Sequence, residues 1–365
     1  MALGTLEIVL PRRPGKCSIF FGENLTDRLP LEPFSGVSSV AIVSDDIVAG
    51  LYAKELEKCV SKEIKTSLVI MRHGERNKNL LTVSRIANKI SDLGLDRKSA
   101  LLALGGGVVG DTTGFVASIF KRGIKYFQFP TTLLAQVDSS IGGKCGVDTR
   151  WGKNQIGTFY QPDGIFISTS TLNTLPKGEI VNGLGEIVKS SIIADRSMFE
   201  EIESSLEDFF SIEKLKTLVR RTCEIKCSVV EKDELETNFR KILNYGHTIG
   251  HAIESSSEYK LSHGKSVILG MMCEGWIANK LGIFNDEDYI RQRNLLLKIK
   301  NQYRIKIEFD RRKILSFAVL DKKTMDSKIK MSLPKEIGNM YSTENGDFTV
   351  PVSKEVLMKS LDCLK

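Results

Sequence analysis

The first half of the chain alternates short apolar runs with amphipathic helical patterns. VAIVSDD (40–46) and LLALGGG (101–107) have the character of buried strands, whereas residues 48–60 and 81–94 place apolar side chains at i, i+3 and i+4. Parallel strands need a crossover, usually a helix, between them. The alternation therefore predicts a parallel sheet with helices on its faces and ligands at the carboxyl ends of its strands. Further strands are predicted at residues 1–16, 67–75, 126–132 and 164–169.

The pattern changes after residue 176, where long stretches of helical periodicity follow one another. A mostly helical second domain is expected, which divides the chain into residues 1–176 and 177–365. A short hairpin is predicted within residues 321–338. The helices are expected at residues 179–195, 197–205, 213–231, 243–256, 263–281 and 286–302.

Composition excludes several classes of protein. No apolar run approaches the roughly 20 residues that span a membrane, and the first residues lack the apolar block of a signal peptide, so a cytoplasmic protein is expected. The net charge of +7 comes without a basic stripe interleaved with aromatic residues, which argues against nucleic-acid binding. The seven cysteines form no Cys-x-x-Cys pair and are expected to be reduced; Cys223 and Cys227 could bind metal, but a pair in a helix core fits better.

Three glycines end one of the predicted strands. In ALGGGVVGDTTGFVAS (103–118) a strand leads through Gly105, Gly106 and Gly107 into a helix, where backbone amides could hold a pyrophosphate. The pattern is not G-x-G-x-x-G and follows the fourth predicted strand, so a tight turn without a ligand fits about equally well. Glu75 and Lys78, after another strand, could hold ribose hydroxyls or lie in a solvated loop.

Residues 129–162 are rich in small and polar residues and lack clear periodicity. They are expected to form a long ligand-binding loop, because such segments often carry function. Asp138, Lys144, Lys153 and Asn154 supply charges and amide groups suited to phosphate or carboxylate.

Two of the four histidines, His247 and His251, are one helical turn apart and share a face. They could bind a metal, relay protons, or be adjacent by chance. HTIGH lacks the glutamate of H-E-x-x-H, which argues against a metalloprotease. A catalytic zinc site needs three protein ligands. His247, His263 and Glu186 are candidates, although spacing alone favours ordinary hydrogen-bonded histidines.

Five motifs in order, GGGVVGDTTGF, FPTTLLAQVDSSIGGK, GKNQIGTFYQP, GLGEIVKSSII and LNYGHTIGHAIE, resemble the 3-dehydroquinate synthase family of the sugar phosphate cyclase superfamily. The resemblance implies an α/β plus α fold, with a Rossmann-like parallel-sheet NAD domain before a mostly helical domain for metal and substrate. It also implies a homodimeric carbon–oxygen lyase of the shikimate pathway that uses NAD and zinc or cobalt. Such an enzyme converts 3-deoxy-D-arabino-heptulosonate 7-phosphate to 3-dehydroquinate and phosphate by transient oxidation, elimination, reduction and aldol cyclisation.

The resemblance assigns residues to three roles. The metal ligands are Glu186, His247 and His263, and His251 contacts substrate and handles protons. The other substrate and catalytic residues are Arg122 (reaching the neighbouring subunit), Lys144, Lys153, Asn154, Lys189, Lys226, Arg240, Asn244 and one of Lys322 or Lys323. NAD contacts are Asp45, His73, Gly74, Glu75, Arg76, Asn77, Lys78, Gly107, Val108, Val109, Gly110, Asp111, Thr131, Thr132, Asp138, Lys144, Lys153, Thr171, Leu172, Asn173 and Thr174.

The chain departs from the family at three positions. Ile47 stands where relatives often have Asn, Cys145 where Thr is usual, and Ser190 where Tyr is common. Ile47 puts one cofactor hydrogen bond in doubt, and Cys145 is a weaker donor than Thr. The alternatives are a cyclase with another carbocyclic product, a polyol dehydrogenase, and an inactive binding protein.

Overall fold

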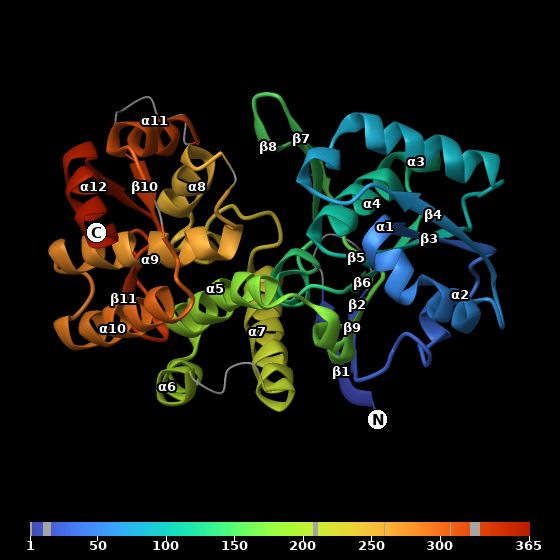
Figure 1. Ribbon diagram of the computed structural model, residues 1–365, viewed down its shortest axis with the longest axis horizontal. Coiled ribbons are helices and arrows are strands. Elements are labelled where there is room, and N and C mark those ends of the chain that lie inside the picture. Colours follow the sequence, from blue (N-terminus) through green and yellow to red (C-terminus); the bar gives the residue numbers. More distant parts are fainter. Residues whose placement is uncertain (1, 10–15, 207–210, 259, 307, 322–328) are drawn as a thin grey trace. The chain divides into compact units, whose positions relative to one another are not determined.

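The computed structural model describes residues 2–9, 16–206, 211–258, 260–306, 308–321 and 329–365 (Figure 1). The chain forms two compact units. Unit 1 is Met1–Pro176 with Lys226–Glu231, and unit 2 is Lys177–Ile225 with Lys232–Lys365. The division predicted at residue 176 did not include the return of Lys226–Glu231 to unit 1.

Unit 1 is built on a seven-stranded sheet of order β1-β2-β9-β6-β5-β3-β4. Among the described strand pairs of this sheet only β1–β2 is antiparallel, so the predicted parallel sheet is confirmed. The second strand was not predicted, and the glycine turn therefore follows the fifth strand rather than the fourth. The strands are β1 (Ala2–Val9), β2 (Lys16–Gly22), β3 (Ser39–Asp45), β4 (Lys65–Met71), β5 (Ala100–Gly105), β6 (Lys125–Pro130) and β9 (Gly164–Ser168).

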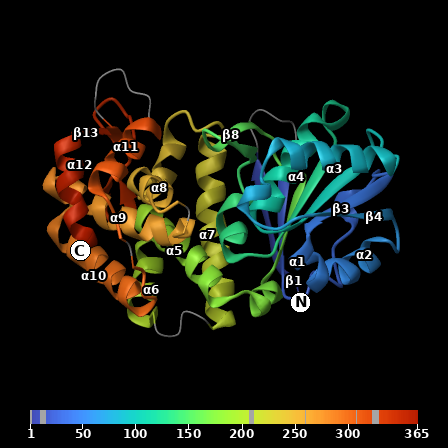
Figure 2. The same cartoon turned by 45° about the horizontal axis from the view of Figure 1, so that its top comes forward.

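Helices cover both faces of this sheet, as Figure 2 shows for α3 (Leu80–Asp92) and α4 (Gly107–Ile119) on one of them. Val43 of β3 packs with these two helices, whereas its neighbour Ile42 packs with α2 (Lys54–Val60) on the other face. Successive strand residues point to opposite faces, and both faces are buried here. The strands consequently read as continuous apolar runs instead of alternating ones.

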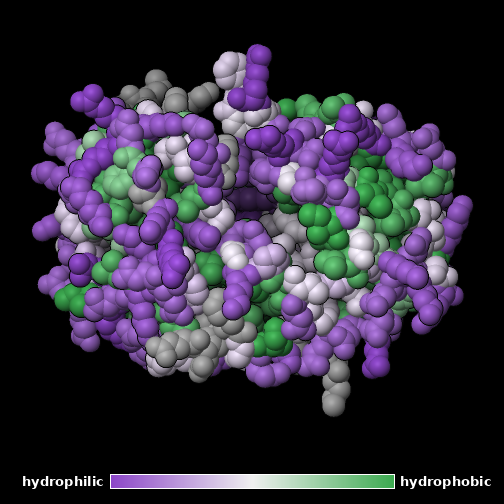
Figure 3. Space-filling view, viewed as in Figure 1, coloured by the Kyte–Doolittle hydropathy of each residue, from purple (hydrophilic) through white to green (hydrophobic). Residues whose placement is uncertain are grey.

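The segment 129–162, predicted to be a long loop, is mostly ordered structure. It holds the end of β6, the π-helical turn η5 (Ala135–Ser139) and an antiparallel hairpin of β7 (Lys144–Thr149) and β8 (Gly152–Phe159). The loop prediction was wrong because β8 is exposed along most of its length, so no apolar alternation marks it. The tip of the hairpin, with Trp151 76% exposed, projects from the surface (Figure 3).

Unit 2 is mostly helical, as predicted. The range 243–256 is the exception: the 3₁₀ turn η8 (Phe239–Asn244) precedes α8 because Gly246, with φ +77°, interrupts the helical backbone. No described helix of either unit has the length and apolarity to cross a membrane. The helices are α5 (Lys177–Ala194), α6 (Arg196–Ser205), α7 (Ile212–Lys232), α8 (His247–Ser256), α9 (His263–Lys280), α10 (Asp286–Gln302), α11 (Arg311–Asp321) and α12 (Lys354–Ser360).

The hairpin predicted within residues 321–338 does not form in the described part of that range; residues 322–328, with Lys322 and Lys323, lie outside it. β10 (Ile329–Met331) pairs instead with β13 (Val350–Val352), and β11 (Pro334–Glu336) pairs with β12 (Asn339–Met340). A strand pattern specifies a strand but not its partner, which here is a distant segment.

All seven cysteines are free, in agreement with the prediction of reduced thiols, and Cys223 and Cys227 are buried in α7.

Candidate active site

In unit 1 the carboxyl ends of β3 and β5 meet at the point where the strand order reverses. The chain goes from β3 outward to β4, and β5 then returns to the other side of β3. Open parallel sheets bind ligands at such a switch point. Asp45 ends β3 and Gly105 ends β5, so this is where the glycine turn lies.

The glycine turn leaves the first amides of α4 without a side-chain cap. Gly106 is the N-cap residue and contributes no capping side chain. A Cβ on Gly106 would lie 3.0 Å from Thr132 Cγ2, and one on Gly107 would lie 3.0 Å from Ser139 Oγ. Side chains at these positions would fill the space beside the helix start. The uncapped amides and the helix dipole together suit a phosphate group, so the residues present fit the pyrophosphate of a dinucleotide.

Carboxylates hold the predicted cationic residues of unit 1 in place. Lys78 Nζ, 5% exposed, lies 2.5 Å from Asp111 Oδ2 and donates to Asn154 Oδ1 at 2.5 Å. Burial acts to lower the pKa of Lys78, but Asp111 and Glu75 outweigh it and raise the pKa, so the ammonium stays charged. Lys226 Nζ lies 2.5 Å from Asp138 Oδ1.

Lys153 Nζ lies 3.2 Å from Glu75 Oε1, which joins the loop after β4 to the β7–β8 hairpin. His73 bonds Asp46 through its ring and is exposed; it belongs to unit 1, whereas the other three histidines belong to unit 2. Asp45 accepts the N–H groups of Ile47 and Val48 and so caps the short helix that follows β3.

Several residues predicted to contact NAD have side chains that are buried in the core or hydrogen-bonded within it. Val109 is in the hydrophobic cluster, Leu172 is buried, and Thr171 Oγ1 bonds Gln136 Nε2 and the Ser168 carbonyl. Their part in cofactor binding stays a prediction, and it would fall to the backbone. Cys145 also packs in the core, where its thiol bonds the Tyr160 carbonyl and burial raises its pKa.

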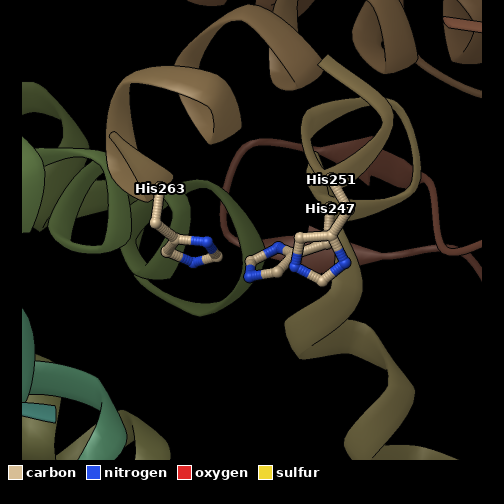
Figure 4. Close-up of side chains that lie close together, drawn as sticks. All are labelled: His247, His251 and His263. Carbon is tan, nitrogen blue, oxygen red and sulfur yellow. The ribbon is translucent and has the colours of Figure 1, made fainter. Parts of the chain in front are cut away.

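In unit 2 three imidazoles and one carboxylate converge. His247 and His251 come from α8 and His263 begins α9, and one ring nitrogen of each lies within 4.8 Å of the others (Figure 4). Glu186 of α5 is 1% exposed; its Oε1 lies 3.4 Å from His247 Nε2 and 3.5 Å from His263 Nε2. Glu186 also forms an ion pair with Lys189.

These distances fit a tetrahedral metal ion. Zinc ligands at about 2.1 Å in tetrahedral geometry are separated from one another by about 3.4 Å. His247 Nδ1 bonds the Tyr245 carbonyl at 3.1 Å and His263 Nδ1 faces Glu254 Oε2 at 3.3 Å, so both rings turn Nε2 toward Glu186. Such outer partners typically orient metal-binding histidines. The donor set of Glu186, His247 and His263 therefore fits a divalent metal.

The charge states of Glu186 and His247 also suit a cation. Burial acts to raise the pKa of Glu186, but Lys189 and His247 outweigh it and hold the pKa well below its ordinary value, so the carboxylate is ionised. Burial and Lys189 lower the pKa of His247, which keeps that imidazole neutral and able to bind a metal. Burial acts to lower the pKa of His263, but hydrogen bonds to Glu186 and Glu254 outweigh it and raise the pKa to about 10. Because metal ions bind ionised carboxylate and neutral imidazole, His263 would release a proton when a metal binds.

Glycines let the three helices approach closely enough for this convergence. A Cβ on Gly264, next to His263, would overlap the Asn182 carbonyl, and one on Gly185, next to Glu186, would overlap the backbone of Gly264. A Cβ on Gly270 would overlap the Gly246 carbonyl beside His247. Backbone-to-backbone contact at glycines therefore sets the helix spacing around the candidate ligands Glu186, His247 and His263.

Arg240 and Asn244, both in η8, are held by acidic residues that the sequence analysis missed. Asp233 accepts the N–H groups of Thr237, Asn238 and Arg240. Burial acts to raise the pKa of Asp233, but these N–H groups outweigh it and lower the pKa to about 2. Asn244 Nδ2 donates to Glu236 Oε1 at 2.6 Å. A run of acidic residues at 231–236 was the available signal.

The fold and the two candidate sites define a class of protein: an α/β unit whose sheet edge suits a nucleotide, and a helical unit whose histidine–carboxylate cluster suits a metal ion. Two family descriptions match the chain, 3-dehydroquinate synthase N-terminal over residues 68–182 and 3-dehydroquinate synthase C-terminal over residues 183–324. The chain belongs to the 3-dehydroquinate synthase family, as the sequence motifs indicated.

Curated relatives and a solved structure agree with this assignment. The chain is 42% identical to the 3-dehydroquinate synthase of Thermodesulfovibrio yellowstonii over 84% of this chain and 87% of that one. It is 40% identical to that of Dictyoglomus thermophilum over 93% and 94% of the two chains. The crystal structure of a 2-deoxy-scyllo-inosose synthase with carbaglucose-6-phosphate, NAD⁺ and Co²⁺ matches with a TM-score of 0.90 and 27% identity, covering 98% of each chain.

Proposed function

We propose that the protein is a lyase of the shikimate pathway that converts 3-deoxy-D-arabino-heptulosonate 7-phosphate to 3-dehydroquinate and phosphate. The observation that carries the proposal is the convergence of Glu186, His247 and His263 in a chain about 40% identical to curated 3-dehydroquinate synthases. When bound, NAD⁺ accepts a hydride and returns it, and a divalent metal acts as a Lewis acid toward a substrate hydroxyl.

The chain's own residues would bind NAD in unit 1 and the metal in unit 2. The uncapped amides of α4 would hold the pyrophosphate, and Glu75 and Lys78 would face the ribose. Glu186, His247 and His263 would hold the metal, with Lys189 next to Glu186 keeping that carboxylate ionised.

Proton transfer would fall to His251. Its ring centroid lies 5.2 Å from that of His247 and 5.6 Å from that of His263, so it adjoins the metal centre without being one of the three assigned ligands. A histidine at such a position can accept a proton at one ring nitrogen and return it, which typically contributes roughly 10²–10⁴-fold to a rate.

Anion binding would use cationic and amide side chains. The substrate carries a carboxylate and a phosphate, which suit the fork of Arg240, the point charges of Lys144, Lys153 and Lys226, and the amides of Asn154 and Asn244. Arg240 is 2% exposed and Lys226 is 7% exposed. Groups held in place in this way bind an anion without losing much side-chain entropy.

The function is tested by incubating the protein with the heptulosonate phosphate, catalytic NAD⁺ and zinc while phosphate release and absorbance at 340 nm are followed together. Stoichiometric phosphate without lasting NADH is expected. NADH that accumulates without phosphate would instead indicate a polyol dehydrogenase. Turnover of glucose 6-phosphate but not of the heptulosonate phosphate would indicate a cyclase with another product.

A homodimer in which Arg122 completes the neighbouring subunit's site is also proposed. Arg122 is exposed, with φ +68°, at the end of the turn after α4. Inactive Arg122→Ala and inactive His251→Ala chains are mixed in equal amounts and allowed to exchange subunits. About half of the dimers are then mixed, and one of the two sites in each mixed dimer is complete, so about a quarter of the wild-type activity should return. If Arg122 served its own subunit, every site in the mixture would lack one of the two residues and no activity would return.

A further inference from the structure

Glu274 is a carboxylate in the interior of unit 2 to which neither the family motifs nor the proposed mechanism gives a role. It lies in α9 and is 0% exposed. Its two oxygens accept backbone N–H groups of a different helix: Oε2 accepts Gly246 N–H at 2.7 Å and Oε1 accepts Ile249 N–H at 2.9 Å. A buried carboxylate is costly unless it is hydrogen-bonded, so this pair of bonds accounts for its presence in an apolar helix.

Both donors belong to the start of α8. Gly246 is the N-cap residue of α8 and has no side chain to cap it, and Ile249 is the third residue of that helix. An N-cap side chain ordinarily accepts the N–H of the second or third residue. Glu274 supplies this acceptor from a neighbouring helix, and its negative charge lies at the positive end of the α8 dipole.

His247 is the first residue of α8, and His251 lies one turn further along the helix. Close packing presses this turn against α9: a Cβ on Gly246 would lie 2.5 Å from Met271 Cγ and 3.1 Å from the Val267 carbonyl. His263 begins α9 itself. The position of α8 on α9 therefore sets the separation of His247 and His263.

We propose that Glu274 is a positioning residue of the metal centre, which holds the first turn of α8 on α9 so that His247 and His263 meet one ion. It acts through the α8 backbone. This inference rests on one part of the proposed function, the metal centre. It does not depend on the identity of the substrate or on NAD.

The test measures Co²⁺ binding to the purified full-length chain by chelator competition, together with the visible absorption spectrum of the bound ion. Glu274→Gln keeps the shape of the side chain but places an N–H₂ group against one backbone N–H. It is expected to weaken Co²⁺ binding by about 10–100-fold, the usual effect of losing an outer partner of a metal site, and to alter the cobalt spectrum. Hydrogen exchange at the Ile249 amide should also become faster than in the wild-type chain.

Cys273→Ala is the matched control, because Cys273 is equally buried on the neighbouring position of α9 and belongs to no part of the proposed site. It should lower the melting temperature without changing Co²⁺ affinity. Glu274→Asp retains the charge but is too short to reach both amides, and it should fall between Gln and wild type. It also replaces the Gln variant if that variant does not fold.

Wild-type affinity and spectrum in the folded Gln or Asp variant would overturn the inference, whatever happens to thermal stability. If the proposed metal centre were wrong, the result would differ, because His263→Ala would then leave Co²⁺ binding unchanged. Tight binding that depends on both His263 and Glu274, without phosphate release from the sugar acid, would support the inference while refuting the proposed reaction.

Discussion

His263→Ala is expected to abolish tight metal binding and to lower turnover of the heptulosonate phosphate by about a thousandfold or more. His263 is one of the three proposed donors, with Nε2 3.5 Å from Glu186 Oε1, and a metal acting as a Lewis acid supplies several kcal/mol of stabilisation to a developing charge. The side chain is 24% exposed, so its removal leaves only a small cavity and the chain should stay folded. Metal content after dialysis and the rate of phosphate release measure the two effects.

His73→Ala is the control for the metal measurement. His73 is the one histidine placed outside the cluster, is exposed, and pairs with Asp46 in unit 1. Its replacement should leave the metal content unchanged, although it lies in the loop assigned to NAD. A His263→Ala protein that retains one metal ion per chain after dialysis would contradict the proposed ligand set.

Gly264→Ala should destabilise unit 2 strongly and remove metal binding with it. The added Cβ would overlap the Asn182 carbonyl, which is backbone and cannot rotate away, so α5 and α9 would have to separate. Overpacking of this kind typically costs about 1–3 kcal/mol and sometimes more. Separation of these helices also moves Glu186 away from His263. Thermal melting and Co²⁺ titration of the wild-type and Gly264→Ala proteins measure the loss of stability and the loss of metal binding.

Gly178→Ala provides the comparison, since it adds the same methyl group to α5 where nothing lies within 4 Å. Alanine is the better helix former, so this change should be neutral or stabilising by up to about 1 kcal/mol. Equal melting temperatures for the two variants would show that backbone contact at Gly264 does not hold the helices together.

Local sequence patterns predicted most of the helices and the parallel sheet. A helix or strand with a buried face repeats its apolar residues at a fixed spacing, which is visible within that one segment. α9, predicted at 263–281, is His263–Lys280, and α10, predicted at 286–302, is Asp286–Gln302. Predictions failed where a segment shows no hydrophobic period, or where a strand pairs with a segment distant in the sequence. β8 is exposed on both faces, Gly246 breaks a helical pattern at one residue, and β10 pairs with a strand some twenty residues further on.

The candidate site was predicted through ordered motifs and not through spacing. Spacing alone could not separate His247 from His251, and the structure brings both rings into the cluster, so their different roles stay a prediction. The supporting carboxylates Glu254 and Glu274 were missed. One signal was visible in the sequence: Glu274 interrupts the apolar run GMMCEGWIA, where a charged residue needs a buried partner.

Close backbone contact around the metal ligands has a consequence for ionic radius. Because glycines bring α5, α8 and α9 into backbone contact, the helices that carry Glu186, His247 and His263 are held close together by main-chain packing. With two imidazole donors and one carboxylate, and with Glu186 Oε1 at 3.4 and 3.5 Å from the two histidine Nε2 atoms, the proposed centre would suit an ion that binds at about 2.0–2.2 Å, such as zinc, better than calcium, which takes six to eight oxygen ligands at about 2.3–2.6 Å. Selectivity for the ion is thus expected to depend on main-chain packing, so substitutions that shift α8 on α9, such as Glu274→Gln, should alter it, whereas substitutions elsewhere should not.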